Sequence, residues 1–327
     1  MTPKEIIVEA WNMTRRERKI RAWGFVSELL STLLDTKLLI YQSYFLYSYL
    51  QGDPIGFFAM EEMLMAILPT WGFITFIVIL ITLLVLEVFI PKMCLGAIIG
   101  LAAKAHKKEE VKGGLVLALY NFLQIFAIRE LFVLSHITMI ITISSLIIRY
   151  MPPGIQLPLI VLSFAMWVLS NIFRFFAIFA EEDIVIRKSG MITAIGRSFK
   201  LIVSHLSHVF FLLLLLLVIS IRVLLNAIVL FVLPALILGI SVILAYFFSA
   251  LLTFLLSTIA GIILVLFASY FFAYLHVFTQ TVWTITYMEL QKKKDLDIIN
   301  VEQETEAPVE AATEESGLTD TGEVATA

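Results

Sequence analysis

The sequence has almost no cysteine and few charges, and both shortages narrow its class. Its single cysteine, Cys94, excludes a disulfide framework and any zinc site built from several cysteines. Only 15% of the 327 residues are charged, against about 25% in ordinary soluble domains. The phosphate-binding P-loop, the GxSxG motif and the dinucleotide-binding fingerprint are also missing. We therefore expect neither an ordinary soluble domain nor a cofactor.

Apolar residues, by contrast, are abundant, at 60% of the chain with a mean hydropathy of +0.97. A bilayer core of about 30 Å needs roughly 20 apolar residues as a helix, so the sequence predicts an all-α, polytopic integral membrane helical bundle. Six transmembrane helices are expected, at residues 23–50, 64–90, 131–151, 157–179, 208–233 and 250–282. Pro234 and Gly239 mark the expected break before the last helix, with 236–249 as a re-entrant turn. The tract 209–287 would also accommodate three shorter spans.

The positions of the charges indicate an orientation. Residues 1–294 carry 23 basic and 16 acidic side chains, whereas ten acidic and no basic residues follow from Asp295 onward. With six spans, 20 of the 23 basic residues fall on one side, which is the cytoplasmic side because Lys and Arg are retained there. We predict a protein of the prokaryotic cytoplasmic (inner) membrane with both termini in the cytoplasm and no cleavable signal peptide. Residues 1–294 would form the transmembrane domain and 295–327 a disordered acidic tail that could engage a cytosolic protein.

Three segments that precede spans suit helices lying at the cytoplasmic membrane surface. They cover residues 3–21, 111–128 and 189–205, and their central alanines are Ala10, Ala118 and Ala194. An interfacial helix followed by an out-and-back hairpin would thus occur three times, which indicates a threefold internal repeat. The alternative is that every juxtamembrane helix needs a similar pattern. The sequence leaves both interpretations open.

Short motifs in these regions resemble a known family. The stretches are KGGLVLALYNFLQIFAIREL, DIVIRKSGMITAIGRSFKLI and TVWTITYMELQKKKDLDI. They resemble the membrane-domain family related to the membrane portion of glycerophosphoryl diester phosphodiesterases and to YciC-type six-span bacterial membrane proteins, over roughly residues 1–297. The residues that fit its patterns are Ala194, Arg197, Ser198, Tyr287, Glu289 and Leu290, although Gln291 stands where a basic residue is more usual. Because the chain has no room for a phosphodiesterase barrel of about 250 residues, the resemblance implies a fold and no activity.

Charged residues inside predicted spans form the first candidate site. Glu28, Asp35 and other polar residues follow one face of the first span, and Asp35 and Lys37 lie near its middle. Arg222 lies at comparable or greater depth in the fifth span, so we predict an Asp35–Arg222 pair, with Lys37 either extending to the membrane surface or joining the cluster. The alternative is that each group is satisfied locally and only holds the bundle together.

A second candidate site is a basic collar on the cytoplasmic face for anionic lipid headgroups. Its residues lie on or beside the interfacial helices and are Lys107, Lys108, Lys112, Arg187, Lys188, Arg197 and Lys200. Below it, a layer of charged helix ends is expected from Glu87, Arg129, Glu130, Arg174 and Glu181 to Asp183. Nucleic-acid binding is not expected, because the basic groups lie beside spans, where their main role is to determine the orientation of the chain in the membrane.

One enzyme class remains as a distant alternative. Intramembrane CAAX-type proteases use EExxxR and FxxxH motifs, which Glu181, Glu182 and Arg187, and Phe272 with His276, approximate with a first spacing one residue too long. His205 and His208 have a metal-ligand spacing but no Cys or carboxylate nearby, so no metal site is predicted. The sequence therefore favours a non-enzymatic scaffold or lipid-interacting, envelope-associated protein. The main alternative is a transporter of a small solute or lipid with a polar path near the first and fifth spans, and the oligomeric state is open.

Overall fold

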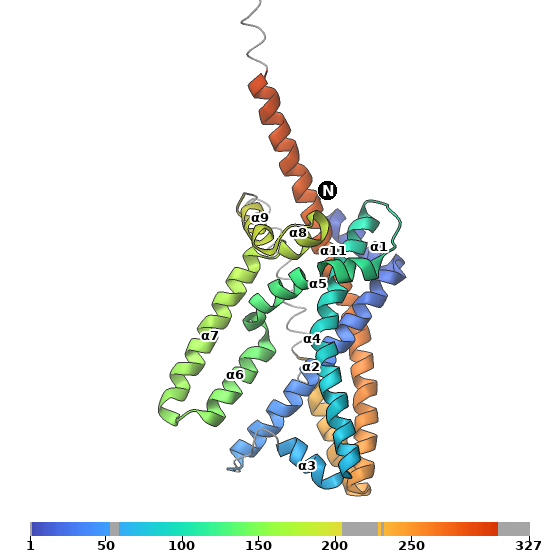
Figure 1. Cartoon of the computed structure of the whole chain (residues 1–327), viewed down its shortest axis with the longest axis vertical. Coiled ribbons are helices and arrows are strands. Elements are labelled where there is room, and N and C mark those ends of the chain that lie inside the picture. The colour runs from blue at the N-terminus through green and yellow to red at the C-terminus, as the bar shows by residue number, and fades with distance from the viewer. Residues whose placement is uncertain (1, 53–58, 205–227, 230–231, 307–327) are drawn as a thin grey trace, which may run out of the picture. The chain divides into compact units, whose positions relative to one another are not determined.

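The computed structural model describes residues 2–52, 59–204, 228–229 and 232–306, and every regular element within them is helical (Figure 1). The first helices are α1 (Pro3–Arg16), α2 (Arg18–Leu50), α3 (Ala59–Ile67), α4 (Thr70–His106) and α5 (Gly114–Leu131). After the 3-10 helix η1 (Val133–Ser135) come α6 (Ile137–Tyr150), α7 (Pro153–Phe176), α8 (Ala180–Arg187) and α9 (Met191–Ser204). A helix at Val232–Phe247 and α11 (Ala250–Glu306) complete the described chain. The all-α prediction is confirmed for these residues.

Several of these helices are long and apolar enough to cross a membrane. Four long candidate spans are Thr70–His106, Gly114–Leu131, Pro153–Arg187 and Ala250–Lys292, and two shorter apolar helices are Ile137–Tyr150 and Val232–Phe247. None of the residues of α7 is buried against other parts of the protein, as expected for a helix surrounded by lipid. The chain is a multi-pass helical membrane protein by length and composition. Gly114–Leu131, where the sequence predicts an interfacial helix, also meets the criteria for a span.

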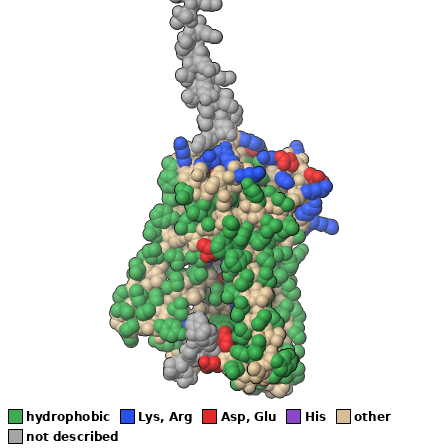
Figure 2. All heavy atoms as spheres, viewed as in Figure 1, with side chains coloured by type: hydrophobic (Ala, Val, Ile, Leu, Met, Phe, Trp, Pro, Cys, Tyr) green, Lys and Arg blue, Asp and Glu red, His purple; other side chains and the backbone are tan. Residues whose placement is uncertain are grey.

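The compact unit formed by residues 1–285 has two chemically different ends. Lys and Arg side chains gather where α1, α8 and α9 lie, and apolar side chains cover the flanks (Figures 1 and 2). We call the end formed by α1, residues 104–114, α8 and α9 the basic end. The turn between α6 and α7 and helix α3 lie at the opposite end (Figure 1).

Helix α4 joins both ends and changes character along its length. From Trp71 to Leu86 its large apolar side chains are mostly exposed, whereas Cys94 to Ala103 are buried. Gly96 and Gly100 let α5 approach closely, because a Cβ atom at Gly96 would lie 3.3 Å from the Leu117 carbonyl oxygen. The sequence predicts that this span ends near Ile90, but the helix continues to His106 and its last part forms the protein core.

The three predicted surface segments are helical and each is seated by its central alanine. Ala10 of α1, Ala118 of α5 and Ala194 of α9 are all 0% exposed. The first segment stops earlier than predicted, because Glu17 adopts an extended conformation between α1 and α2. A larger side chain at any of these alanines would have no free space and would push its helix away from the rest of the unit.

Two predicted boundaries are wrong. The span expected at 131–151 is interrupted, since α5 ends at Leu131 and α6 starts only at Ile137. The re-entrant turn expected at 236–249 is not seen, because residues 236–247 are helical and the turn falls at Phe248–Ser249. Pro234 lies within the described helix and does not end it. Most of the span predicted at 208–233 lies outside the described residues.

Residues 286–327 form a second unit, which we describe by itself. Within it, the Gln291 amide donates to the Tyr287 hydroxyl and Lys292 Nζ lies 2.9 Å from Glu289 Oε1. Helix α11 continues to Glu306, so residues 295–306, assigned from composition to a disordered tail, are helical. The rest of the predicted tail, 307–327, lies outside the described residues.

Candidate functional site

The break between α5 and α6 is the starting point of the candidate site. Residues 133–135 form a single 3-10 turn, and His136 is extended, with φ −77° and ψ 135°. Non-helical backbone at membrane depth is tolerated only where protein buries it or where it lines a cavity. The break is supported here by polar side chains from another helix.

Ser135 connects the break to α7. Its carbonyl oxygen accepts a hydrogen bond from Trp167 Nε1 at 3.2 Å, and its hydroxyl oxygen accepts one from the Arg174 guanidinium at 2.8 Å. The same hydroxyl donates to the Phe132 carbonyl oxygen at 2.7 Å. Arg174 is thereby held with part of its guanidinium turned to the space beside the break.

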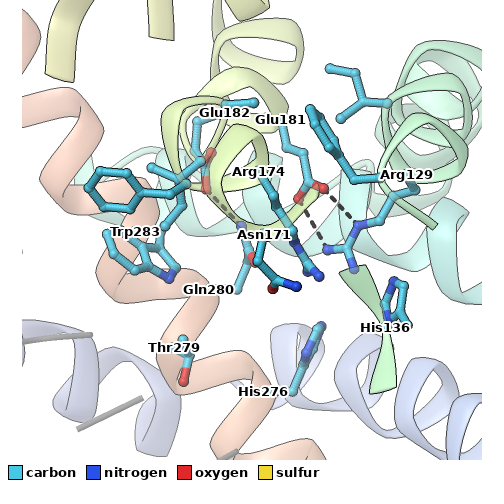
Figure 3. Close-up of a pocket in the computed structure, with 15 residues that line it drawn as sticks. Arg129, His136, Asn171, Arg174, Glu181, Glu182, His276, Thr279, Gln280 and Trp283 are labelled. Atoms are coloured by element: carbon cyan, nitrogen blue, oxygen red, sulfur yellow. Dashed lines mark hydrogen bonds and ion pairs between the residues drawn. The ribbon is translucent and has the colours of Figure 1, made fainter. Parts of the chain in front are cut away.

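That space is a cavity of about 360 Å³ at the meeting of α5, α7, α8 and α11 (Figure 3). Its polar lining residues are Arg129, His136, Asn171, Arg174, Glu181, Glu182, His276, Thr279 and Gln280. The side chains of Arg174, Asn171, His136 and His276 project toward one another beneath the Arg129–Glu181 pair (Figure 3). Most of these groups are nitrogen donors, which suits an anionic or strongly accepting ligand.

The cationic groups of the cavity differ in how they are compensated. Arg129 makes two hydrogen bonds with Glu181, from Nε to Oε1 at 2.7 Å and from an Nη atom to Oε2 at 3.1 Å. Such a bidentate pair neutralises both charges. Arg174 has no carboxylate within ion-pair distance among the described residues, and it donates a hydrogen bond to the neutral Ser135 hydroxyl. One positive charge in the cavity is therefore not offset by a direct contact.

Glu182 is the most deeply buried acid of the site, with 1% of its surface exposed. Gln280 Nε2 donates to its Oε1 at 2.7 Å, while its Oε2 is buried without a partner among the described residues. A buried carboxyl oxygen without a hydrogen bond is unfavourable. The site thus retains one unsatisfied acceptor as well as one uncompensated cation.

The described residues of the intramembrane polar cluster predicted from the sequence each contact a group outside the cluster. Lys37 Nζ pairs with Glu87 Oε2 of α4 at 2.6 Å, and Glu28 Oε1 lies 2.9 Å from Nδ1 of His276. Asp35 faces the hydroxyl of Thr138 in α6, and its predicted partner Arg222 lies outside the described residues. Neither Glu28 nor Asp35 lines the cavity.

The collar residues all lie at the basic end, and three of them contact neighbouring groups. Lys112 pairs with Glu110, and the Arg197 guanidinium donates to Ser189 Oγ at 2.8 Å and lies 3.6 Å from Asp183. Lys188 takes a left-handed conformation, φ 55°, and its Nζ lies 5.4 Å from the centre of the Tyr120 ring. The remaining members, Lys107, Lys108, Arg187 and Lys200, lie in or beside α4, α8 and α9.

Ser198, one of the residues that carry the family resemblance, has a structural role. Its hydroxyl donates to the Phe176 carbonyl oxygen at 2.8 Å and accepts from the Phe179 amide at 3.1 Å. It therefore caps the joint between α7 and α8, which carries Arg174 on one side and Glu181 and Glu182 on the other. The capping depends on α9 lying against this joint, and Ala194 permits that close contact.

Sequence reasoning found part of this site and missed the rest. Arg129, Arg174, Glu181 and Glu182 were expected in one charged layer at the helix ends. His136, Asn171 and Gln280 were not assigned to it. One signal was present, since Asn171 and Arg174 are three residues apart and thus share a face of α7.

The residues that approximate the protease motifs do not all lie at one place. Glu181, Glu182 and His276 do line one cavity, but Arg187 does not. Glu181 is occupied by Arg129, which leaves Glu182 as the carboxylate available to activate a water. Among the described residues, no group of three or more His, Cys, Asp or Glu side chains could hold a metal ion.

Comparisons with protein-family models, with curated proteins and with solved structures give no match. The family resemblance therefore stays a prediction that depends on the motifs alone.

Proposed function

We propose that the chain is a non-enzymatic, lipid-interacting protein of a prokaryotic cytoplasmic membrane that holds an anionic lipid headgroup in the cavity beside the α5–α6 break. The proposal includes six spans, the basic end and both termini in the cytoplasm, and α1, α5 and α9 as interfacial helices that begin three repeated hairpins. Membership of the six-span family that its motifs resemble belongs to the same proposal. The gathering of Lys and Arg at one end supports the orientation (Figure 2).

The observation that carries the binding role is Arg174. Its guanidinium lines the cavity, and no carboxylate among the described residues lies within ion-pair distance. An uncompensated cation in such a place is unfavourable unless an anion or water reaches it. A phosphate group accepts several hydrogen bonds at once from a guanidinium group, so Arg174 suits it.

The test uses the full chain and phosphatidylglycerol that carries a photoreactive diazirine in its headgroup. We expect adducts on peptides that contain Phe132 or Phe175, both of which line the cavity. Replacing a charge-assisted hydrogen bond removes about 1.5–3 kcal/mol, so Arg174→Gln should reduce this labelling by roughly tenfold or more. Arg174→Lys, which keeps the charge, should retain part of it.

Lys200→Gln is the matched control, because Lys200 is an exposed basic residue of the collar that does not line the cavity. It should leave labelling of the Phe132 and Phe175 peptides within twofold. Equal labelling in wild type and in Arg174→Gln, with both proteins monodisperse, would refute the proposal. Loss of labelling in Lys200→Gln alone would instead assign the lipid to the collar.

Transport is a second candidate, favoured by a series of polar contacts along α2. Glu28 contacts His276, Lys37 contacts Glu87, and Gln42 Oε1 accepts from Arg149 at 3.1 Å. These pairs link α2 to α11, α4 and α6 from the basic end toward the opposite end.

If they border a water-filled path, a cysteine at Ser31 should react with a membrane-impermeant maleimide in intact vesicles. The Cys94→Ala background removes the native thiol, which is itself buried, and protection of Ser31→Cys from both sides would exclude the path.

A further inference from the structure

A separate niche lies between α2 and α11, outside the cavity described above. It has a volume of about 380 Å³ and is lined by Arg18, Arg21, Ala22, Phe25, Tyr270, Ala273 and Tyr274. The two arginines come from the first turn of α2, and the apolar and aromatic residues continue away from them along both helices. None of these residues belongs to the cavity or to the collar.

The niche is held open by a close crossing of its two helices. A Cβ atom at Gly24 would lie only 2.1 Å from Val277 Cγ2, so the α2 backbone touches α11 directly at this point. Gly24 is therefore required for the contact. One helical turn from this crossing, α2 carries Arg21 and α11 carries Tyr274 in place of small residues, and both side chains line the niche.

The charges of the niche are not compensated by an acidic side chain of the described residues. No carboxylate among the described residues lies within ion-pair distance of Arg18 or Arg21. Arg21 Nε is buried and has no hydrogen-bond partner among the described residues. A buried guanidinium N–H without an acceptor is costly, and a phosphate oxygen is the acceptor that guanidinium groups bind best.

Aromatic residues fix the arginine in place. The Arg21 guanidinium lies 5.6 Å from the centre of the Tyr274 ring, and Tyr274 packs against Trp11 of α1 at 5.8 Å. The Phe25 and Tyr270 rings are in contact at 6.5 Å, and Tyr270 is 65% exposed. The niche thus has a cationic head on an apolar wall that faces outward, which matches the division of a phospholipid into headgroup and acyl chain.

We propose that this niche binds one anionic glycerophospholipid, with its phosphate on Arg21 and Arg18 and an acyl chain along Phe25 and Tyr270. A lipid fits better than a free phosphate because more than half of the lining is apolar or aromatic and continues along the helices. An anionic headgroup fits better than a zwitterionic one, since two positive charges line the niche and none of its described lining residues is acidic and able to meet a choline.

The test uses the full chain in bilayers and phosphatidylglycerol with a diazirine on an acyl chain, followed by peptide mapping after illumination. Adducts are expected on the peptides that contain Phe25 and Tyr270. Excess unlabelled phosphatidylglycerol should reduce them by at least fivefold, whereas excess inorganic phosphate should leave them unchanged, given that an acyl chain contributes to binding. Diazirine-labelled phosphatidylcholine should give clearly less labelling at the same positions.

Arg21→Gln should lower the labelling by about tenfold and Arg18→Gln by about two- to threefold, because Arg18 is exposed and its pairing is screened by water. Arg15→Gln is the matched control, since Arg15 is an exposed arginine at the same end that lines no described niche. Arg174→Gln should also leave the labelling of the Phe25 and Tyr270 peptides unchanged, which distinguishes the niche from the cavity. If Arg21→Gln and Arg18→Gln both label as wild type, or if inorganic phosphate competes, the proposal is wrong.

Discussion

Helix α4 is built from different residues on either side of Pro91. On one side, Trp71, Ile74 and Val78 expose 75%, 57% and 57% of their surface. On the other, Ile98 and Ile99 expose 0%, and Gly96 and Gly100 receive α5. The exposed half needs only to be apolar because lipid accepts any such side chain, whereas the buried half needs residues of a particular size.

Glu87 lies where the two halves meet, and its pairing with Lys37 should be the most sensitive point of the helix. The Glu87 side chain is 0% exposed, so Glu87→Leu leaves a lysine ammonium group without its counter-charge. Removing one partner of a buried pair costs about 3–5 kcal/mol. We expect Glu87→Leu to lose most of its monodisperse protein in size-exclusion chromatography after heating. The double variant Lys37→Met/Glu87→Leu should recover it, and a double variant as unstable as the single one would show that the two residues act independently.

The glycines of the buried half should give the next largest effect. Gly96→Leu forces a side chain against Ile125 Cδ1 at 3.0 Å and against the Leu117 backbone. Overpacking of this kind costs about 1–3 kcal/mol or more. Gly72→Leu in the exposed half meets only Pro69 at ordinary distances of 3.5 Å and beyond. The apparent melting temperature in detergent should fall for Gly96→Leu and stay near wild type for Gly72→Leu, and an equal fall in both would remove the distinction between the halves.

The smallest effect is expected from one methyl group removed from each half. Ile98→Val deletes a methyl group at a fully buried position, for which losses are about 0.5–1.5 kcal/mol. Ile79 is 53% exposed, so Ile79→Val should change stability by less than about 0.5 kcal/mol. Chemical denaturation of both variants in the same detergent measures the difference. A larger loss for Ile79→Val would mean that a protein partner, rather than lipid, covers the exposed half.

The sequence predicts the helices of this protein better than it predicts their ends. Hydropathy locates helical segments within α2, α4, α7 and α11 because an apolar tract has few alternatives in lipid. The break after Leu131 was missed, since Leu-Phe-Val-Leu reads as uninterrupted span and the compensating partners, Trp167 and Arg174, come from another helix.

The candidate site, too, is predicted only in part by the sequence. Composition and spacing find charged residues at the helix ends, but they do not say which helices are neighbours. Lys37 and Glu87 are 50 positions apart, and Glu28 and His276 are farther apart still. Such pairs follow from the order in which helices surround α2, which periodicity along one segment does not contain.

The hydrogen bond between Glu182 and Gln280 also constrains how the protein is made. The two residues are 98 positions apart, so a ribosome must deliver the whole intervening chain before the carboxyl group receives its amide donor. Arg129 and Glu181 both precede Gln280 in the chain, whereas His276, Gln280 and Trp283, which form one wall of the cavity, are synthesised after them. Every chain truncated before Gln280 therefore leaves Glu182 without that donor.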